Sequence, residues 1–250
     1  MLAVVGPWLA PRDPDAANVL MAMKPMGTPG YPLGTDQLGR DVLSRILVAI
    51  RTSVTFGVWP AVVVVVLSTV IGLVSGYFGG WIDAVLMRVL DVLLAFPFFI
   101  LAVALVTYLG PSLQNAMIAL IVLSLPGNVR VIRSVVLSAR ERPFVEAAIL
   151  LGYGRVGIIF GELLPSVVPN AITLAALDAA HMIAAGSALS FLGLGAQPPT
   201  ADLGSMINEA RAYLRQQPSL TLVPVVVLGA ITFVLFTFTD AVQRRMGDVR

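Results

Sequence analysis

The sequence contains no cysteine and a single histidine, and only 12% of its 250 residues are charged. Without cysteine there are no disulfides, no thiolate metal sites and no cysteine nucleophile, and one histidine is too few for a histidine-rich metal site. No stretch reads GxxxxGKS or GxxxxGKT, the phosphate-binding loop of many ATPases. The net charge of +2 gives no reason to expect nucleic acid as a partner. Soluble domains carry about twice this share of charge, so the composition indicates a membrane protein.

Long uncharged runs predict an all-α, polytopic membrane protein with one transmembrane domain over residues 1–250. A span needs about twenty apolar residues. We expect complete spans at Val54–Phe78, Val92–Gly110, Leu113–Leu137, Val167–Gly193 and Leu220–Thr239. Met1–Ala10 is apolar but too short, so we expect it to be the end of a first span that is truncated here. This gives six spans with both ends in the cytoplasm.

Small residues recur every four positions along and just beyond the first complete span, at Ser68, Gly72, Gly76 and Gly80. Small side chains on one helix face let another helix approach closely. Glycines facing lipid would gain nothing from their size. We therefore predict that this stripe packs against protein, in this chain or in a partner.

The segment 138–165 separates two predicted spans and is expected to be a cytoplasmic loop. A short helix should run from Pro143 to Leu151, because proline suits the first helical position. Gly152 and Gly154 should end it, since glycine readily takes the left-handed conformation that closes helices. An isolated helix of roughly nine residues is marginal in water, so a partner must stabilise it.

One apolar stripe runs along this helix at i, i+3, i+4 and i+7, and its members are Phe144, Ala147, Ala148 and Leu151. Basic residues favour the cytoplasmic side of a membrane, and five arginines surround the helix: Arg130, Arg133, Arg140, Arg142 and Arg155. The helix alone has two interpretations. It either docks on another protein or is an interfacial helix between two spans.

Residues 11–53 are expected to form an external loop followed by an amphipathic helix. The first part, to Gly34, is rich in proline, glycine and aspartate and has no periodicity. From Val42 to Ile50 apolar residues alternate with charged ones at helical spacing, which is typical of a helix lying at the membrane surface.

Ionisable residues inside a span are costly and are candidates for function. Asp178 and His181 are three positions apart, so they share a helix face and can bond to each other. Together with Asn170 they are candidates for a translocation path, where they would hold a peptide terminus or backbone. The alternative is a satisfied polar pair that faces a neighbouring helix.

Three stretches carry a resemblance to a known family. EAAILLG, followed after twelve intervening residues by Pro165, resembles the EAA loop of ABC importer permeases. GTDQLGRDVLSR and SFLGLGAQPP resemble the dipeptide, oligopeptide and nickel branch, and its C-type permease subunit in particular. The chain departs from the pattern at Gly161, where a basic residue is usual, and at Gly186, where glutamate is common.

The resemblance implies a type I ABC importer permease fold and half of a translocation pore. It implies a second homologous permease, two ATP-binding subunits that hold ATP and Mg, and an extracytoplasmic substrate-binding protein, all at a bacterial inner membrane. This chain would bind no cofactor. The EAA loop would be the helix that couples to the ATPase, through Phe144, Glu146, Ala147, Ala148, Leu151, Gly152 and Pro165.

The function expected from the resemblance is import of dipeptides or oligopeptides. A permease of the same branch that imports nickel, haem or another small solute is the alternative, because the motifs are shared. A secondary transporter or channel would show internal repeats and ionisable residues in several spans. A membrane-embedded enzyme would need a catalytic set, and none is visible.

Overall fold

The computed structural model describes residues 2–247 of the chain, so Met1 of the predicted first segment lies outside it. No β-strand occurs in this part of the chain, which has only two isolated β-bridges. The α-helices are α1 Leu2–Leu9, α2 Val42–Phe78, α3 Gly80–Leu94, α4 Phe98–Leu109, α5 Leu113–Arg140, α6 Pro143–Leu150, α7 Arg155–Ile158, α8 Leu164–Phe191, α9 Leu203–Ala210 and α10 Ser219–Gly247. The remaining elements are the 3-10 helices η1 Val19–Met21 and η3 Arg211–Tyr213 and the π-helix η2 Ile159–Leu163.

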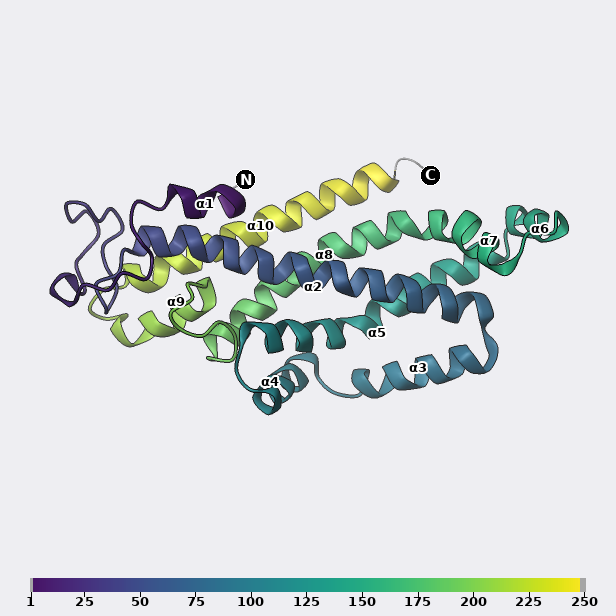
Figure 1. Cartoon of the computed structure of the whole chain (residues 1–250), viewed down its shortest axis with the longest axis horizontal. Helices are drawn as coiled ribbons and strands as arrows, with labels where there is room; N and C mark the ends of the chain where they lie inside the picture. The colour runs from purple at the N-terminus through teal and green to yellow at the C-terminus, as the bar shows by residue number, and fades with distance from the viewer. Residues whose placement is uncertain (1, 248–250) are drawn as a thin grey trace.

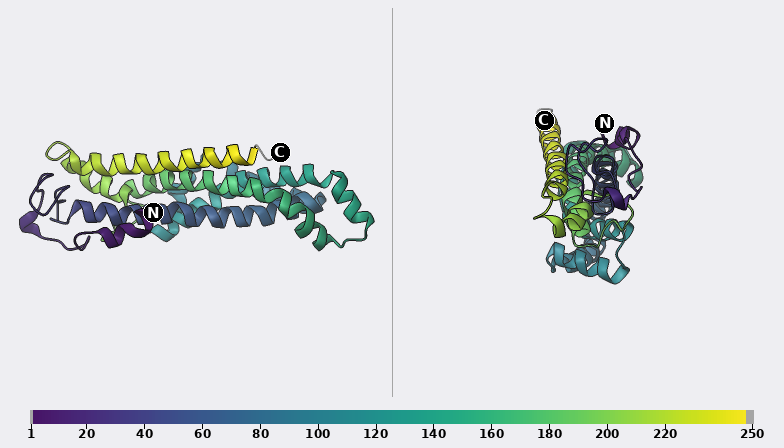
Figure 2. Two further views of the ribbon diagram at one scale, coloured as in Figure 1. Left: turned by 90° about the horizontal axis from the view of Figure 1, so that it is seen from above. Right: turned by 90° about the vertical axis from the view of Figure 1, so that its left-hand side faces the viewer.

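The central element is α2, which packs along α5 and α8 and has α1 beside its first part (Figure 1). On one side of this core α10 lies against α8 and α9, and on the other α3 and α4 lie against α5 (Figure 2). The bundle is elongated. One end carries the cap, by which we mean residues 10–41 and 196–218, and the opposite end carries α6.

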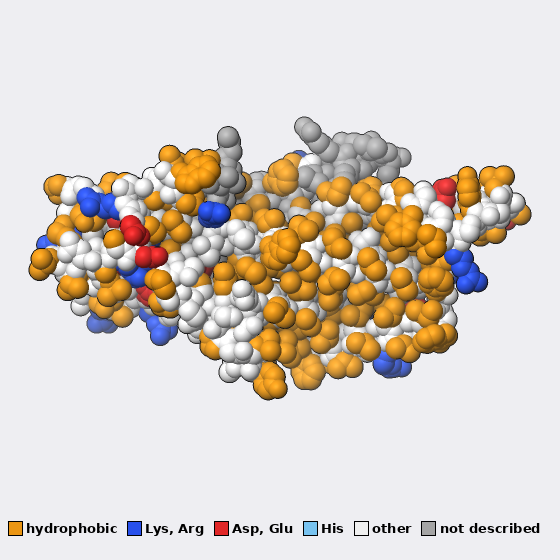
Figure 3. Space-filling model, viewed as in Figure 1, with side chains coloured by type: hydrophobic (Ala, Val, Ile, Leu, Met, Phe, Trp, Pro, Cys, Tyr) orange, Lys and Arg blue, Asp and Glu red, His pale blue; other side chains and the backbone are white. Residues whose placement is uncertain are grey.

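Within residues 2–247 four helices are long and apolar enough to cross a membrane, namely α2, α5, α10 and the continuous helix Arg155–Phe191 that contains α8. This confirms the spans predicted at Leu113–Leu137, Val167–Gly193 and Leu220–Thr239. Hydrophobic side chains cover most of the surface between the two ends, while charged side chains gather at the cap and near α6 (Figure 3). That distribution is the one a membrane-spanning bundle requires.

Two predicted boundaries are wrong. The amphipathic helix expected at Val42–Ile50 is the first part of α2, which runs unbroken for 37 residues, about 55 Å. Its apolar residues pack against α9 in the cap instead of lying on a membrane surface. The predicted span Val92–Gly110 is instead the pair α3 and α4, bent by 89° at a break before Phe98. Proline disfavours a helical conformation in the preceding residue, so Pro97 accounts for the break.

The small-residue stripe packs against α5 of this same chain, which gives the prediction a defined partner. A Cβ at Gly72 would lie 2.6 Å from a methyl carbon of Ile132, and one at Gly76 would lie 2.8 Å from Val136. Ser68 is fully buried. Gly80 does not belong to the stripe, because α2 ends at Phe78 and Gly80 is the exposed first residue of α3.

The motif GTDQLGRDVLSR builds the core of the cap through buried charges. Arg40 donates to Asp36 at 2.6 Å and to Glu209 of α9 at 2.8 Å, and its side chain is only 4% exposed. The buried Arg45 donates to the carbonyl of Pro14 and to Asp15. The bond between Arg40 and Glu209 ties the loop before α2 to the segment after α8, 169 positions along the chain, and the bonds of Arg45 tie α2 to the same loop.

The start of α2 also depends on this motif. Asp41 is the N-cap residue and accepts hydrogen bonds from the backbone N–H of Ser44 at 2.9 Å and from its hydroxyl at 2.6 Å. Gly39 has φ +73°, and a Cβ there would lie 1.8 Å from the carbonyl oxygen of Asn18. The glycine of the motif is therefore required for the loop to close.

Asp202 is the N-cap of α9 and links it to α2, because its carboxylate accepts from Ser205 N–H and from the Ser53 hydroxyl at 2.9 Å. Burial raises the pKa of this carboxyl, and the hydrogen bonds from Ser53 and Ser205 oppose the rise. The folded state thus holds the proton more tightly than the unfolded chain does. The contribution to stability is full below the ordinary pKa and is lost as pH rises through the raised value.

We therefore expect Asp202→Asn to melt at the same temperature as the wild type or higher near pH 8, with a weaker pH dependence. The amide oxygen keeps the bond from the Ser205 N–H, the amide N–H₂ donates to the Ser53 hydroxyl in place of accepting from it, and the buried charge is removed. Asp202→Ala should lose the cap and about 1 kcal/mol at any pH. Thermal unfolding of the assembled protein from about pH 4, near the ordinary pKa of 3.8, up to pH 8 measures both, and a wild-type profile parallel to that of Asp202→Asn contradicts the prediction.

Candidate functional site

The helix α6, Pro143–Leu150, begins with a proline and ends in a closed C-terminal turn. Gly152 has φ +82°, its N–H donates to the Ile149 carbonyl, and the N–H of Tyr153 donates to the Ala148 carbonyl. This pair of bonds is the Schellman motif, which requires a left-handed residue at the position of Gly152. Gly154 has φ −70° and closes nothing, so the prediction that both glycines end the helix holds only for Gly152.

The faces of α6 differ from the predicted stripe. Ala148 is 3% exposed and packs with Val145 into the core of this chain, so it is not free to meet another protein. Phe144 and Leu151 are exposed, at 37% and 77%. Ala147 and Glu146 are exposed as well. The predicted stripe places Ala148 on the same face as Phe144, Ala147 and Leu151. In the structure Ala148 instead shares the buried face of the helix with Val145, because this face packs against the core of the chain.

Sequence reasoning missed three exposed apolar residues of this segment, which lies at the extreme end of the bundle (Figure 1). Leu150 is 82% exposed, and Ile149 and Tyr153 are each 57% exposed. The signal was present in the unbroken apolar run Ile149 to Leu151, which an eight-residue helix cannot bury on one side. We call the exposed apolar residues of this segment the α6 tip: Phe144, Ala147, Ile149, Leu150, Leu151 and Tyr153. Such patches mark interaction sites.

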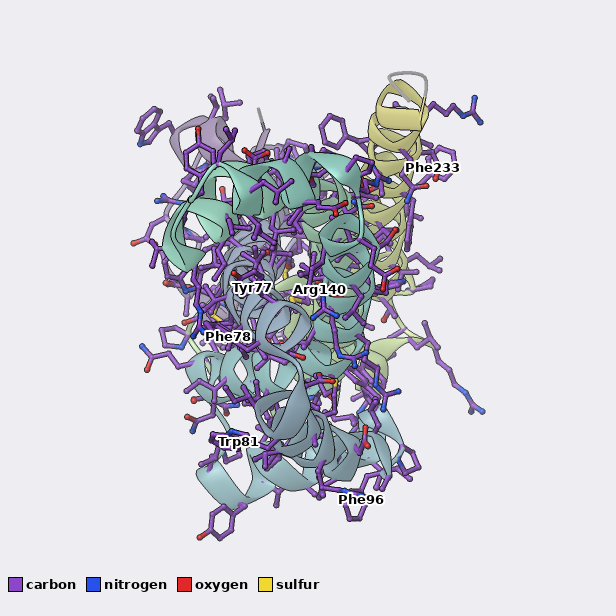
Figure 4. All side chains as sticks on the ribbon, turned by 90° about the vertical axis from the view of Figure 1, so that its right-hand side faces the viewer. Tyr77, Phe78, Trp81, Phe96, Arg140 and Phe233 are labelled. Atoms are coloured by element: carbon purple, nitrogen blue, oxygen red, sulfur yellow. The ribbon has the colours of Figure 1, made fainter. Side chains whose placement is uncertain are left out.

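Three of the five arginines predicted to surround α6 hold helices of this chain together. Arg140 donates to the Gly76 and Tyr77 carbonyls at the C-terminus of α2, both at 3.2 Å (Figure 4). Arg133 pairs with Asp83 of α3 at 2.6 Å, and Arg130 pairs with Asp91. Arg142 and Arg155 make no ion pair with the described residues.

Pro165, which closes the EAA pattern, lies inside the continuous helix Arg155–Phe191. The turn just before it, Ile159–Leu163, is a π-helix. Proline has no N–H to bond the carbonyl four residues earlier, and a wider turn accommodates that loss. The helix therefore changes pitch between α6 and the apolar part of α8.

Asp178 and His181 line one hollow, together with Phe98, Phe99 and Ser124 from α4 and α5. Among the described residues they do not bond to each other, contrary to the predicted pair. The Asn128 amide donates to Asp178 from α5. The His181 ring lies edge-on to Phe236 of α10, with centroids 5.7 Å apart. Each polar group thus faces a neighbouring helix and also borders the hollow.

Asn170 lies eight residues before Asp178, about 12 Å along α8, and belongs to a different hollow at the α6 end. We call this the lower hollow. Its polar lining comes from α5, α8 and the residue before α6: Ser134, Ser138, Arg142, Ser166 and Asn170. The side-chain nitrogen of Asn170 is buried and has no partner among the described residues. The structure therefore separates the three candidate path residues into two sites.

Residues 68–248 match the family described as "Binding-protein-dependent transport system inner membrane component". The chain is 33% identical to the dipeptide transport system permease protein DppC of Haemophilus influenzae over 97% of this chain and 84% of that protein. It is 38% identical to the nickel transport system permease protein NikC of Escherichia coli, over 87% of this chain and 78% of that protein. It is 37% identical to the glutathione transport system permease protein GsiD of Pectobacterium atrosepticum, over 77% of this chain and 64% of that protein.

Among solved structures, a chain of the MetNI methionine ABC transporter in inward-facing conformations has a TM-score of 0.51 at 19% identity, covering 78% of this chain and 96% of that one. This likeness shows the type I importer permease fold. Permease subunits of this kind are not enzymes and bind no cofactor themselves, and the ATPase is on separate chains. The chain belongs to the family of binding-protein-dependent ABC importer permeases, in the branch of dipeptide, nickel and glutathione transporters.

Proposed function

We propose that this chain is the C-type permease subunit of an ATP-driven peptide importer in a bacterial inner membrane. A second homologous permease completes the pore, two ATPase subunits carrying ATP and Mg dock at the α6 end, and a substrate-binding protein docks at the cap. The relatives named for dipeptide transport support peptides as the substrate. With this assignment the α6 end is cytoplasmic and the cap is external.

The observation that carries the proposal is the α6 tip. Leu150 and Leu151 are 82% and 77% exposed on a helix that lies beyond the apolar band of the bundle, where water would otherwise cover them. An exposed apolar surface of this kind needs a protein partner. In an importer permease the partner at this loop is the ATPase. We assign the contact to the α6 tip with Gly152 as its backbone support, Glu146 at its polar edge and Pro165 at the helix that follows.

The hollow beside Asp178 supports a path for peptides better than one for metal ions. Its lining is mostly aromatic and aliphatic, with one carboxylate and one imidazole. No group of three potential metal ligands occurs among the described residues. A wide passage with few charged groups in its lining suits peptides, whose side chains vary while their backbone is constant.

Uptake by the reconstituted complex tests this function. The assembled transporter is placed in vesicles with ATP on the α6 side. Uptake of dipeptide, tripeptide, glutathione, nickel and haem is then measured in parallel. We expect ATP-dependent uptake of the peptides. Uptake of nickel or haem with no uptake of peptides would overturn the peptide assignment and keep the importer.

Asp178 provides a test of the path itself. Asp178→Asn should reduce kcat/KM for peptide uptake by about tenfold, the size of one charge-assisted hydrogen bond, while the melting temperature stays near that of the wild type. The amide oxygen can still accept from Asn128, so only the charge is removed. Asn128→Ala is the matched control, because it keeps the charge and removes the contact between α5 and α8. Unchanged uptake by Asp178→Asn and by a stable Asp178→Ala would leave Asp178 with a structural role only.

A further inference from the structure

The lower hollow is polar in a region where most neighbouring side chains are apolar. Three serines, an asparagine and an arginine line it, alongside Val135, Ala139 and Pro169. It opens between α5 and α8 at the α6 end. None of the described residues that line it is acidic.

The hydrogen bonds around the lower hollow leave donors without partners. The hydroxyls of Ser134 and Ser166 donate to the backbone carbonyls of Val131 and Glu162 in their own helices, so their oxygens can only accept further bonds. The buried amide nitrogen of Asn170 has no acceptor among the described residues. Arg142 has no ion pair with them. Arg142 thus gives the hollow a positive charge, and the wall of the hollow holds the amide N–H group of Asn170 without an acceptor.

The lower hollow is in line with the one beside Asp178. On α5 the positions 124, 128, 131, 135 and 138 follow one another at steps of three or four, so they share one helix face. On α8 the positions 166, 170, 173, 177 and 181 do the same. The two hollows are thus successive parts of one seam between α5 and α8. A solute moving toward the α6 end meets the carboxylate of Asp178 first and Arg142 last.

We propose that the lower hollow is an exit site that takes the carboxylate of the leaving solute, through Arg142 and the Asn170 amide. The proposal rests on the proposed import function and adds the chemical group that is recognised. A guanidinium binds a carboxylate through strong, charge-assisted hydrogen bonds. The serine oxygens accept from the amide N–H groups of a peptide. A hydrated divalent cation finds no acid here and is repelled by Arg142.

Because the chain contains no cysteine, single cysteines report access to the hollow directly. Ser138→Cys and Val135→Cys, two lining positions that are not assigned to the carboxylate, are introduced separately into the assembled, nucleotide-free transporter and labelled with a membrane-impermeant maleimide from the α6 side. The label on this chain is read after separation from its partners. A dipeptide on the same side, at twice its Kd, should slow labelling by about threefold, since two thirds of the sites are then filled. Glu141→Cys, exposed beside the hollow but outside its lining, should label at a constant rate.

The charge is tested by comparing a dipeptide with its C-terminal amide. Protection by the free acid should need about tenfold more peptide in Arg142→Gln than in the wild type, and Arg142→Lys should restore part of the loss. Protection by the amide should be weak in all three. Equal protection by acid and amide, or labelling blocked by the ATPase subunits whether or not peptide is present, overturns the exit site.

Uptake measured on the same preparations separates the two levels of the proposal. A complex that imports dipeptides but shows no protection refutes the exit site and leaves the import function standing. A complex that imports nickel instead of peptides refutes both. A complex that imports glutathione is tested with glutathione, whose carboxylates should protect in the same way.

Discussion

Gly152→Val is expected to leave the transporter assembled but to abolish most of its substrate-stimulated ATP hydrolysis and uptake. Gly152 has φ +82°, and no atom lies within 4 Å of the place a Cβ would occupy. The cost therefore comes from the backbone alone, about 1–2 kcal/mol for a residue with a side chain in the left-handed region. The chain can relieve it by opening the turn, which moves Leu150, Leu151 and Tyr153 away from their partner.

Gly154→Val is a matched control for this experiment. Gly154 also has open space around its Cβ position, but its φ of −70° is ordinary for any residue. It should behave like the wild type, and Gly152→Asn should retain part of the activity because asparagine tolerates the left-handed conformation. The measurement is the ATPase rate with and without loaded binding protein, on complexes of equal subunit content. Full stimulation in Gly152→Val would remove α6 from the coupling path.

Arg40→Met should have the largest effect on stability. Arg40 is almost fully buried and pairs with both Asp36 and Glu209, so removing its guanidinium leaves Glu209 without its cation and Asp36 with only the longer contact to Arg45, at 3.7 Å. Breaking a buried ion pair from one side costs about 3–5 kcal/mol, or roughly 10 °C in melting temperature for a chain of this size. Arg40→Lys should rescue little, because one ammonium cannot reproduce the fork that reaches both carboxylates.

Arg215→Met is the control for Arg40→Met. Arg215 is exposed in the cap and forms no ion pair with any described residue. Limited proteolysis should cut the Arg40→Met chain first within the cap and leave the Arg215→Met chain intact. An Arg40→Met protein that melts like the wild type would show that the cap is held by its apolar contacts with α2 alone.

Local chemistry was enough to predict the features that depend on neighbouring residues. Pro143 and Gly152 define the ends of α6 within one residue, because each has a backbone preference that acts where it stands. The continuity of α2 could not be predicted in this way. Arg51, Thr52 and Ser53 interrupt the apolar pattern without breaking the helix. Hydropathy alone therefore predicts a helix boundary at these residues, but the backbone of α2 continues through them.

The candidate site was harder to predict because its contacts join distant segments. The bond from Asn128 to Asp178 spans 50 positions, and the one from Arg40 to Glu209 spans 169. Spacing on one helix suggested instead that Asp178 would bond to His181. The same limit explains Ala148. Its helical position was right, but whether that face meets this chain or another depends on where α5 ends.

The unbroken length of α2 makes it a lever. Its first turns are fixed in the cap by Asp41 and the contacts with α9, and its last carbonyls are clamped by Arg140. No described break separates the two ends, so a tilt imposed at one must appear at the other. Over about 55 Å a rotation of 10° displaces the far end by about 10 Å, roughly the diameter of a helix. A movement of α2 that starts at the α6 end would then be transmitted to the cap by rigid rotation of the whole helix.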